Sequence, residues 1–150
     1  MKALIQRVEH AEVSVHGKVV GSISNGLLIL LCAMKGDNDK DLHYMLRKIS
    51  NLRIFGDSDK KMNLSLLDIK GDALVISQFT LAARSRKGNR PSFDSAEEPE
   101  KAKKTYESFI DKFRETGIRV ESGEFGADMK VEIVNDGPVT LLIDSREEKD

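Results

Sequence analysis

Hydrophobic and polar residues alternate along the first part of the chain, which is the pattern of strands with one buried face. The alternation runs through residues 3–8, 12–16 and 18–24, and Gly17 lies between the second and third stretches as a hairpin pivot. The next run, "LLILLCAM" (27–34), is apolar on both faces and predicts a central strand covered on both sides. The chain therefore begins with strands before any helix.

The spacing of apolar residues then changes to that of a helix with one buried face. The first such face consists of Leu42, Met45, Leu46, Ile49 and Leu52. Asp37 or Asn38 can cap this helix, because either side chain accepts hydrogen bonds from free amides of the first turn. A second helix is predicted from Pro99, which suits a first helical turn, to Gly117, which ends it. The buried face of this second helix consists of Ala102, Tyr106, Phe109, Ile110 and Phe113.

Strand patterns return in the rest of the chain. The predicted strands are residues 72–80, 118–125, 129–134 and 139–144. About seven or eight strands with two main helices, in which hairpins predominate, predict an α/β fold with mixed, largely antiparallel sheets. No repeat or linker divides the sequence, so residues 1–150 are expected to form a single compact domain, with a frayed tail at residues 145–150.

Composition restricts the classes of function. Basic and acidic residues number 24 and 25, and the net charge of −1 excludes a globally basic nucleic-acid binder while it leaves room for local patches. The single cysteine, Cys32, cannot form an intramolecular disulfide, which fits a reducing cytosol. The longest apolar run, residues 27–34, is too short to span a bilayer, and the opening residues lack a secretory signal. We therefore expect a soluble cytoplasmic protein with no membrane partner.

Metal and cofactor chemistry has no signature in the sequence. The three histidines, at positions 10, 16 and 43, and the one cysteine are too scattered for a metal-ligand spacing. There is no glycine-rich dinucleotide motif, no P-loop and no G-x-S-x-G elbow. The expectation is a protein that uses neither a metal nor a cofactor.

Polar residues occur at the end of the apolar strand 72–80, in the sequence "SQFTL" (77–81). Strand ends commonly deliver side chains and backbone N–H groups to a site, which makes Ser77 and Gln78 candidates. Thr80 could act as a nucleophile only with a base within hydrogen-bond reach, and its sequence neighbours are apolar. The alternative is that these residues only mark a strand end.

A basic loop follows in "RSRKGNRPSF" (84–93). Its four cations, within seven positions, are Arg84, Arg86, Lys87 and Arg90. Clustered cations on a loop are a candidate surface for phosphates, and Phe93 could stack on a base or anchor the loop. The alternative is a solvated surface, neutralised in part by the nearby "EEPEK".

A joint between two predicted strands places Gly137 beside Pro138, in "VNDGPVTLLID" (134–144). Proline gives up a backbone N–H and fixes one torsion, so the joint is either a turn that also prevents strand slippage or a rigid loop whose carbonyls point at a ligand. Arg7, in "IQRV", is either exposed or a clamp on the carbonyls of such a loop.

Eight short motifs follow one another along most of the chain. They are "IQRV", "GLLILL", "LRIF", "KMNLSL", "SQFTL", "KGNRPSF", "FGADM" and "NDGPVT". Their order and spacing, from Met1 to about Asp144, resemble those of the D-aminoacyl-tRNA deacylase family, of which "SQFTL" and "NDGPVT" are the most specific signatures. Arg84 departs from that pattern, where many members have an acidic or neutral residue, and this affects only the rim of the expected RNA surface.

The resemblance implies a cytosolic homodimer that hydrolyses the ester between a D-amino acid, or glycine, and the terminal adenosine of tRNA. It also implies a cis Gly137–Pro138 bond, with the carbonyls of these two residues reaching into the partner subunit's site to hold the substrate's α-amino group. Residues 77–80 of one chain would complete that site, and Arg7 would brace the loop from behind. The cations that would contact tRNA are Arg86, Lys87 and Arg90.

Backbone groups would then perform much of the chemistry. The amide of Phe79, helped by that of Thr80, is the candidate donor to the oxyanion. A water activated by the free 2′-hydroxyl of the terminal ribose is preferred to Thr80 as the attacking group. An L side chain would clash with backbone while a D side chain would point to solvent, and glycine mischarged on tRNA(Ala) would also be removed.

Two other functions fit the same residues. One is a non-catalytic module that binds RNA ends. The other is an editing factor for a small L-aminoacyl-tRNA, with a trans Gly-Pro bond and a roomier pocket.

Overall fold

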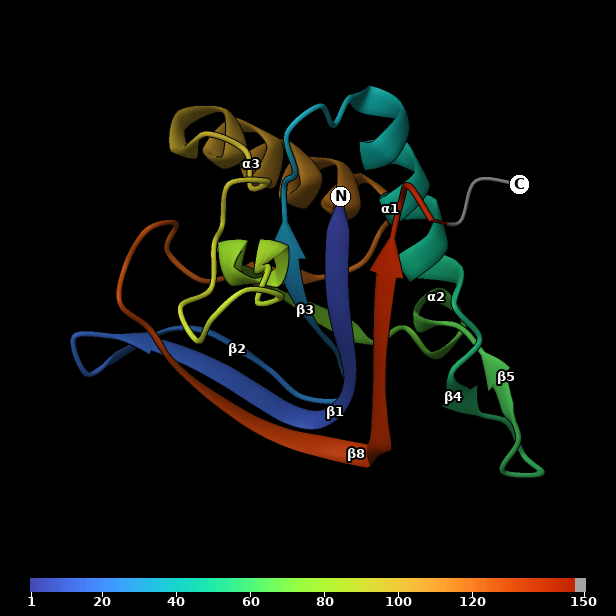
Figure 1. Ribbon diagram of the computed structural model, residues 1–150. Helices are drawn as coiled ribbons and strands as arrows, with labels where there is room; N and C mark the ends of the chain where they lie inside the picture. Colours follow the sequence, from blue (N-terminus) through green and yellow to red (C-terminus); the bar gives the residue numbers. More distant parts are fainter. Residues whose placement is uncertain (148–150) are drawn as a thin grey trace.

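A mixed six-stranded sheet forms the centre of the protein, and two long helices cover one of its faces (Figure 1). The computed structural model describes residues 1–147. The strands of this sheet are β1 (Lys2–Val15), β2 (Lys18–Ile23), β3 (Gly26–Cys32), β6 (Asp72–Ser77), β7 (Val120–Ser122) and β8 (Lys130–Asp144). Their order is β2-β1-β3-β6-β7, and β8 pairs with β1. The pairs β3–β6 and β6–β7 are parallel and the others antiparallel, so the mixed α/β prediction is confirmed.

The first strand is longer than predicted and changes its buried face midway. The stretches 3–8 and 12–16, predicted as two strands, both fall in the single strand β1, which ends at Val15. Ala3 and Ile5 are buried in its first half, whereas Val8 begins the buried set of its second half. The step from Ile5 to Val8 breaks the period of two. Each half of β1 therefore presents its apolar side chains to a different core.

The two cores lie on opposite faces of the sheet. The larger core joins β1, β3 and β6 to the helices, and the smaller one joins the second half of β1 to Ile23, Leu28, Leu74 and Ile76. The sheet curls so that β2 passes over the end of β7. A Cβ at Gly21 would lie 2.8 Å from the carbonyl oxygen of Ser122, so only glycine fits this crossing.

The helices begin and end where their sequences predict. The helix α1 (Asp39–Asn51) begins after Asn38, whose side chain accepts a hydrogen bond from Lys40 N while Asp41 closes a capping box. The helix α3 (Pro99–Glu115) begins with its proline, and Gly117 follows with a φ of +90°. Both predicted helices are confirmed. The short elements that were not predicted are α2 (Leu66–Ile69), the hairpin β4 (Phe55–Gly56) and β5 (Met62–Leu64), and the 3₁₀ helix η1 (Phe79–Ala82).

Four predicted strands differ in the structure. The stretch 72–80 is a strand only to Ser77, because its partner β3 ends at Cys32 and the chain turns into η1. Within the stretch 118–125, only the residues of β7 (Val120–Ser122) form a strand. The stretches 129–134 and 139–144 form the single strand β8, which follows β1 around a corner in Figure 1. The Gly137–Pro138 joint is therefore a corner within one strand, and its interpretation as a turn between two strands is wrong.

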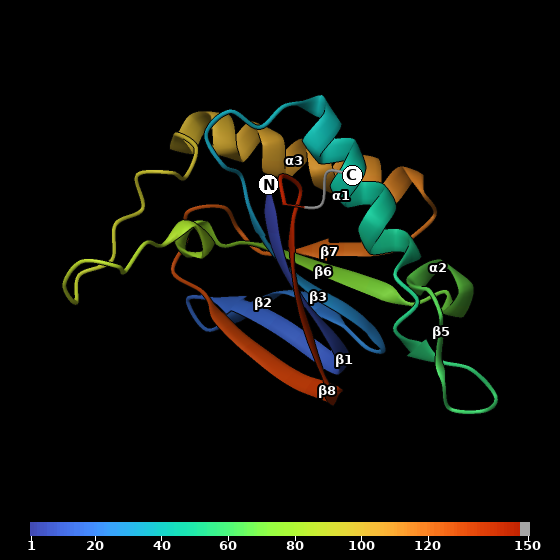
Figure 2. The ribbon, with the colours of Figure 1, turned by 45° about the vertical axis from the view of Figure 1, so that its right-hand side comes forward.

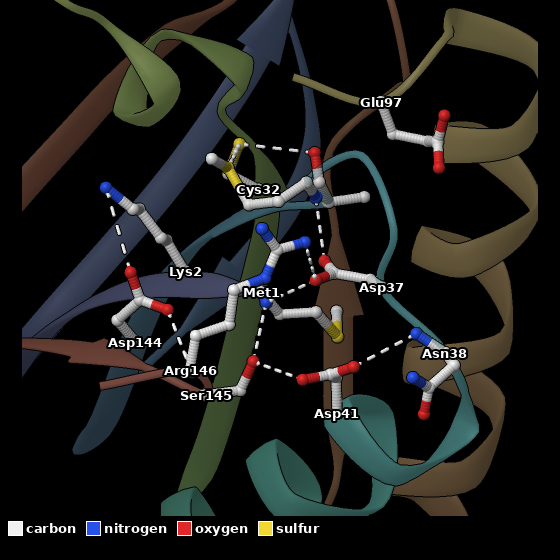
Figure 3. Close-up of polar contacts among 12 residues, drawn as sticks. Met1, Lys2, Cys32, Asp37, Asn38, Asp41, Glu97, Asp144, Ser145 and Arg146 are labelled. Carbon is white, nitrogen blue, oxygen red and sulfur yellow. Dashed lines mark hydrogen bonds and ion pairs between the residues drawn. The ribbon is translucent and has the colours of Figure 1, made fainter. Parts of the chain in front are cut away.

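A buried polar network joins the start of β1 to the residues after β8 (Figure 3). The ammonium group of Met1 lies 2.8 Å from Asp37 Oδ1 and donates to Ser145 Oγ at 2.6 Å. Ser145 in turn donates to Asp41, and Arg146 is paired with Asp37. Ser145 is 3% exposed, so the predicted fraying is wrong at residues 145 and 146 because these side chains complete the network. Residues 148–150 of that predicted tail lie outside the described residues.

None of the helices in the described part of the chain combines the length and the apolar character needed to cross a membrane.

Removing the carboxylate of Asp37 tests this network. The Met1 ammonium group and the Asp37 side chain are 0% and 6% exposed, so Asp37→Ala leaves a buried charge without its partner. We expect the free energy of unfolding, measured with urea, to fall by about 3–5 kcal/mol. Asp59→Ala, at an exposed position, is the matched control and should change it by less than about 0.5 kcal/mol. Equal stability of the two variants would contradict a structural role for the network.

Candidate active site

A cavity of about 1060 Å³ opens at the ends of β3 and β6. Its floor includes Leu31, Cys32 and residues 77–79, its wall on one side is the first half of α3, and residues 90–94 form part of the other side. The cavity thus lies at the carboxyl ends of two parallel strands, a common place for ligands in α/β proteins.

The predicted residues at the end of β6 meet in this cavity. Ser77, Gln78 and Phe79 line it, whereas Thr80 is not among its lining residues. The side chain of Gln78 donates a hydrogen bond to Thr80 Oγ1. Gln78 N donates to Leu31 O at 2.8 Å, which is the last hydrogen bond between the two strands.

The next two amides have no such partner. Within residues 1–147, the N–H groups of Phe79 and Thr80 donate to no acceptor, because they form the first turn of η1. Phe79 itself is 58% exposed. Free amides at the start of a helical turn can stabilise an oxygen that becomes negatively charged.

Side chains that could act as a general base are scarce around these amides. No histidine in the described part of the chain lines the cavity, and its acidic lining residues are Asp94, Glu97 and Glu98. A hydrogen bond from Lys101 holds the pKa of Glu97 below its usual value, and Asp94 accepts a hydrogen bond from Ser92 at 2.6 Å. Both carboxylates are therefore occupied by neighbouring side chains.

Two further ionisable groups of the cavity remain protonated at neutral pH. Burial raises the pKa of the Cys32 thiol to about 11 and that of Tyr106 to about 12. Tyr106 donates its hydroxyl hydrogen to Val75 O at 2.8 Å, inside β6. Tyr106 was predicted only as a core residue, because a tyrosine on the buried face of a helix carries no sequence signal for a site.

The basic loop forms an arm beside the cavity. Arg84 and Ser92 exchange two backbone hydrogen bonds, of 2.8 and 2.9 Å, and residues 85–91 extend beyond them into solvent (Figure 2). Three predicted RNA-contacting cations lie on this exposed segment, namely Arg86, Lys87 and Arg90. Among residues 1–147 none of the three forms an ion pair, and the acids of "EEPEK" pair elsewhere, Glu97 with Lys101 and Glu98 with Lys35.

The corner of β8 is held by Arg7. Its Nε donates to Asp136 O at 2.8 Å and its guanidinium also donates to Ile54 O at 2.6 Å, so the clamp acts on the carbonyl before Gly137. The Gly137–Pro138 bond is cis. The side chain of Arg7 is 14% exposed, so the alternative interpretation of Arg7 as an exposed residue is wrong.

A second brace crosses the corner from within β8. Asn135 exchanges hydrogen bonds with Val139, accepting from its amide at 3.0 Å and donating to its carbonyl at 3.1 Å. Gly137 has a φ of +153°, and a Cβ there would lie 2.6 Å from Val139 N. Asn135 was missed as a brace, although an asparagine two residues before a Gly-Pro pair is a known signal for such local hydrogen bonds.

Within one chain the two groups of candidate residues do not meet. Residues 77–79 line the cavity, while Gly137 and Pro138 are not among its lining residues. Figure 1 shows the corner of β8 at the bottom, away from η1. The corner lies beside Arg7, and β6 ends at Ser77, which pairs with Leu31 near the opposite end of the sheet.

The strand β8 is also an edge strand with an exposed apolar surface. Within the described residues it pairs with β1 alone. Its exposed apolar side chains are Val131, Ile133, Val134, Leu141 and Leu142. A long edge with this composition is a candidate surface for protein association.

No group of three or more metal-ligating side chains is placed to hold a metal ion within residues 1–147.

Comparison with known proteins gives a consistent family. A family model described as D-Tyr-tRNA(Tyr) deacylase matches residues 4–144. A D-aminoacyl-tRNA deacylase of Thermosipho melanesiensis is 58% identical over 147 residues, covering 97% of this chain and 98% of the relative. One of Aquifex aeolicus is 56% identical over 147 residues, covering 98% and 99%.

Solved structures agree with this fold. A protein described as the c-Myc DNA unwinding element binding protein superimposes with a TM-score of 0.91 at 42% identity, over 96% of this chain and 98% of that one. A probable eukaryotic D-amino acid tRNA deacylase gives a TM-score of 0.81 at 18% identity, over 95% and 97%, which supports the fold alone.

The brace on the corner can be tested by removing Arg7. Arg7→Ala deletes two hydrogen bonds from a guanidinium to backbone carbonyls, and we expect the free energy of unfolding in urea to fall by about 2 kcal/mol. Arg47→Ala removes an exposed arginine of α1 and should leave it within about 0.5 kcal/mol of the original value. If the two variants unfold alike, the corner does not depend on Arg7.

Proposed function

The chain belongs to the D-Tyr-tRNA(Tyr) deacylase family, and we propose from this that it hydrolyses the ester between a D-amino acid and the terminal adenosine of tRNA. The products are the free D-amino acid and tRNA. The observation that supports this best is the pair of amides at the edge of the cavity, those of Phe79 and Thr80, that lack an acceptor within residues 1–147. Ester hydrolysis needs such donors, because its tetrahedral intermediate carries a negative oxygen.

In the proposed reaction, water attacks the ester carbonyl and the carbonyl oxygen takes up negative charge against the amide of Phe79, helped by that of Thr80. The bond to the ribose oxygen then breaks, and the proton lost by water goes to that oxygen. The free 2′-hydroxyl of the ribose directs the water, so the RNA supplies part of the catalysis. This assignment accords with the scarcity of basic side chains in the cavity and with the hydrogen bond that engages Thr80.

We further propose that the active unit is a homodimer whose sites contain residues of both chains. Residues 77–80 of one chain would face Gly137 and Pro138 of the other, since one chain keeps the two groups apart. The exposed apolar edge of β8 supports this arrangement, because the same strand carries the corner.

Chiral selection would follow from where the backbone lies. The carbonyls of Gly137 and Pro138 would hold the substrate's α-amino group while the amide of Phe79 holds the ester oxygen. With these two groups fixed, the hydrogen and the side chain on Cα can be arranged in only one way for each enantiomer. Backbone at the L position excludes L side chains and cannot rotate away, whereas glycine, including glycine mischarged on tRNA(Ala), has no side chain to exclude.

The arm would contact the RNA backbone in the cytoplasm, where charged tRNA occurs. Arg86, Lys87 and Arg90 are exposed and not paired with acids within residues 1–147, so they are free to contact phosphates. The scheme needs no cofactor.

Comparing two esters tests the activity and its chirality. The purified protein should deacylate D-tyrosyl-tRNA at least about 100-fold faster than L-tyrosyl-tRNA, since a steric clash of about 3 kcal/mol gives that ratio. Both esters in buffer alone are the control. Cleavage of both would favour the editing factor with a roomier pocket, and binding of tRNA without any cleavage would favour the RNA-end binding module.

Replacing Thr80 distinguishes the two attacking groups. Under the water mechanism, Thr80→Ala keeps its backbone amide and should turn over D-tyrosyl-tRNA at close to the original rate. Loss of a true nucleophile would lower kcat on the order of 10⁴-fold or more. A loss of that size in a folded variant, measured by single-turnover deacylation, would contradict the water mechanism.

A further inference from the structure

The ring of Phe93 connects the basic arm to the amides of the proposed oxyanion site. Phe93 and Phe79 pack edge to face, with ring centroids 5.1 Å apart and an interplanar angle of 72°. Phe93 directly follows the Arg84–Ser92 bridge that closes the arm, and Phe79 begins η1. The contact therefore joins the returning strand of the arm to the first residue of the 3₁₀ turn.

The base of the arm is fixed on both sides of this contact. Ser95 Oγ donates to Ala82 O at 3.2 Å, at the far end of η1. The backbone of Ser95 is also hydrogen-bonded to the segment after β3, because Lys35 N donates to Ser95 O at 3.0 Å. Phe93 thus lies between a fixed base and an arm that, among residues 1–147, is closed by the two backbone hydrogen bonds between Arg84 and Ser92.

The start of η1 depends on Phe93 more than its end does. At its end, η1 has the hydrogen bond from Ser95, and Ala82 is buried. At its start, the amides of Phe79 and Thr80 have no acceptor among the described residues, and the ring of Phe79 is 58% exposed, with Phe93 as its aromatic neighbour. This ring pair therefore connects the arm to the residues that carry these amides.

We propose that Phe93 is a positioning residue, which orients the amide of Phe79 for catalysis when RNA phosphates occupy the cations of the arm. This inference rests on the proposed deacylase function. Arg86 and Lys87 bind the RNA phosphates. The segment from Arg90 to Phe93 then shifts along the cavity wall, and the ring contact shifts Phe79 with it. Rate, and not only affinity, then depends on the phosphates of the substrate.

The test compares two D-tyrosyl esters in single-turnover reactions at saturating enzyme. One is D-tyrosyl-tRNA, and the other is 2′(3′)-O-D-tyrosyladenosine, which has the same ester and nucleoside but no phosphate. The unaltered protein should hydrolyse the tRNA ester faster by roughly 10- to 100-fold, the loss expected when a catalytic group is slightly misplaced.

Substitutions at the two ends of the connection should remove this difference. Phe93→Leu loses the ring edge, so the ratio of its rate on the tRNA ester to its rate on the adenosine ester should fall to about 1, while its affinity for uncharged tRNA should be retained. Phe93→Tyr keeps the ring and should retain the rate difference. The double variant Arg86→Ala, Lys87→Ala should lose both the rate difference and affinity for tRNA.

The outcomes separate the inference from the function on which it rests. If Phe93→Leu keeps the full rate difference, or if it slows both esters equally, the connection through Phe93 is wrong while the deacylase function stands. Equal rates on the two esters in the unaltered protein would also overturn the connection. If neither ester is hydrolysed, the proposed function itself fails, and this inference fails with it.

Discussion

The change of buried face along β1 is the constraint on which the arrangement of the candidate site depends. The first half of β1 must bury Ala3 and Ile5 against the helices, and the second half must bury Val8 and its successors under the curl of the sheet. The neighbouring strand has to follow this shift. From the pair Gln6–Thr140 to the pair Val8–Asn135, β1 advances by 2 residues and β8 by 5, so 5 − 2 = 3 extra residues bulge out of β8. That bulge is the Gly137–Pro138 corner, and Arg7, the residue at the shift, is the one that holds it.

The end of β6, which leads into the proposed oxyanion donors, is also held in place by the sheet. Val75 O accepts hydrogen bonds from Tyr106 Oη at 2.8 Å and from Gly123 N at 3.2 Å. Gln78 N is bonded to Leu31 O, so the strand is held up to the residue before Phe79. The next amide, that of Phe79, has no acceptor in the described part of the chain. In the proposed site the sheet holds the residue before Phe79, and the contact of Phe79 with Phe93 completes the positioning of its amide. Donors positioned before charge develops on a substrate oxygen can stabilise it without a histidine or a reactive cysteine.

Sequence reasoning succeeded where one local pattern determines the outcome. The apolar spacing and caps predicted α1 and α3, and the doubly apolar run predicted the central strand β3. It failed where the local structure depends on residues far away in the sequence. The corner looked like a turn because its shape depends on the phase of β1, some 130 residues earlier in the chain. The 3₁₀ turn at Phe79 depends on where β3 ends, and the docking of Ser145 depends on the ammonium group of Met1. For the candidate site, the motif "SQFTL" predicted residues of which 77–79 line the cavity, but no local signal marked Tyr106 or the contact between Phe79 and Phe93.

The pairing of β1 with β8 connects the two halves of the proposed site. Its middle is the corner, while its end lies at the cavity, where Met1 is a lining residue and its ammonium group is bound to Ser145 just after β8. The same strand pair therefore sets the position of the groups that would hold the α-amino group in one site and supports the wall of the other. In the proposed homodimer, the corner of one chain would face the cavity of its partner. Each chain would then need its own internal braces, Arg7 and Asn135 at the corner and Phe93 at the 3₁₀ turn, because backbone groups supplied by two chains meet accurately only if each is already rigid in its own chain.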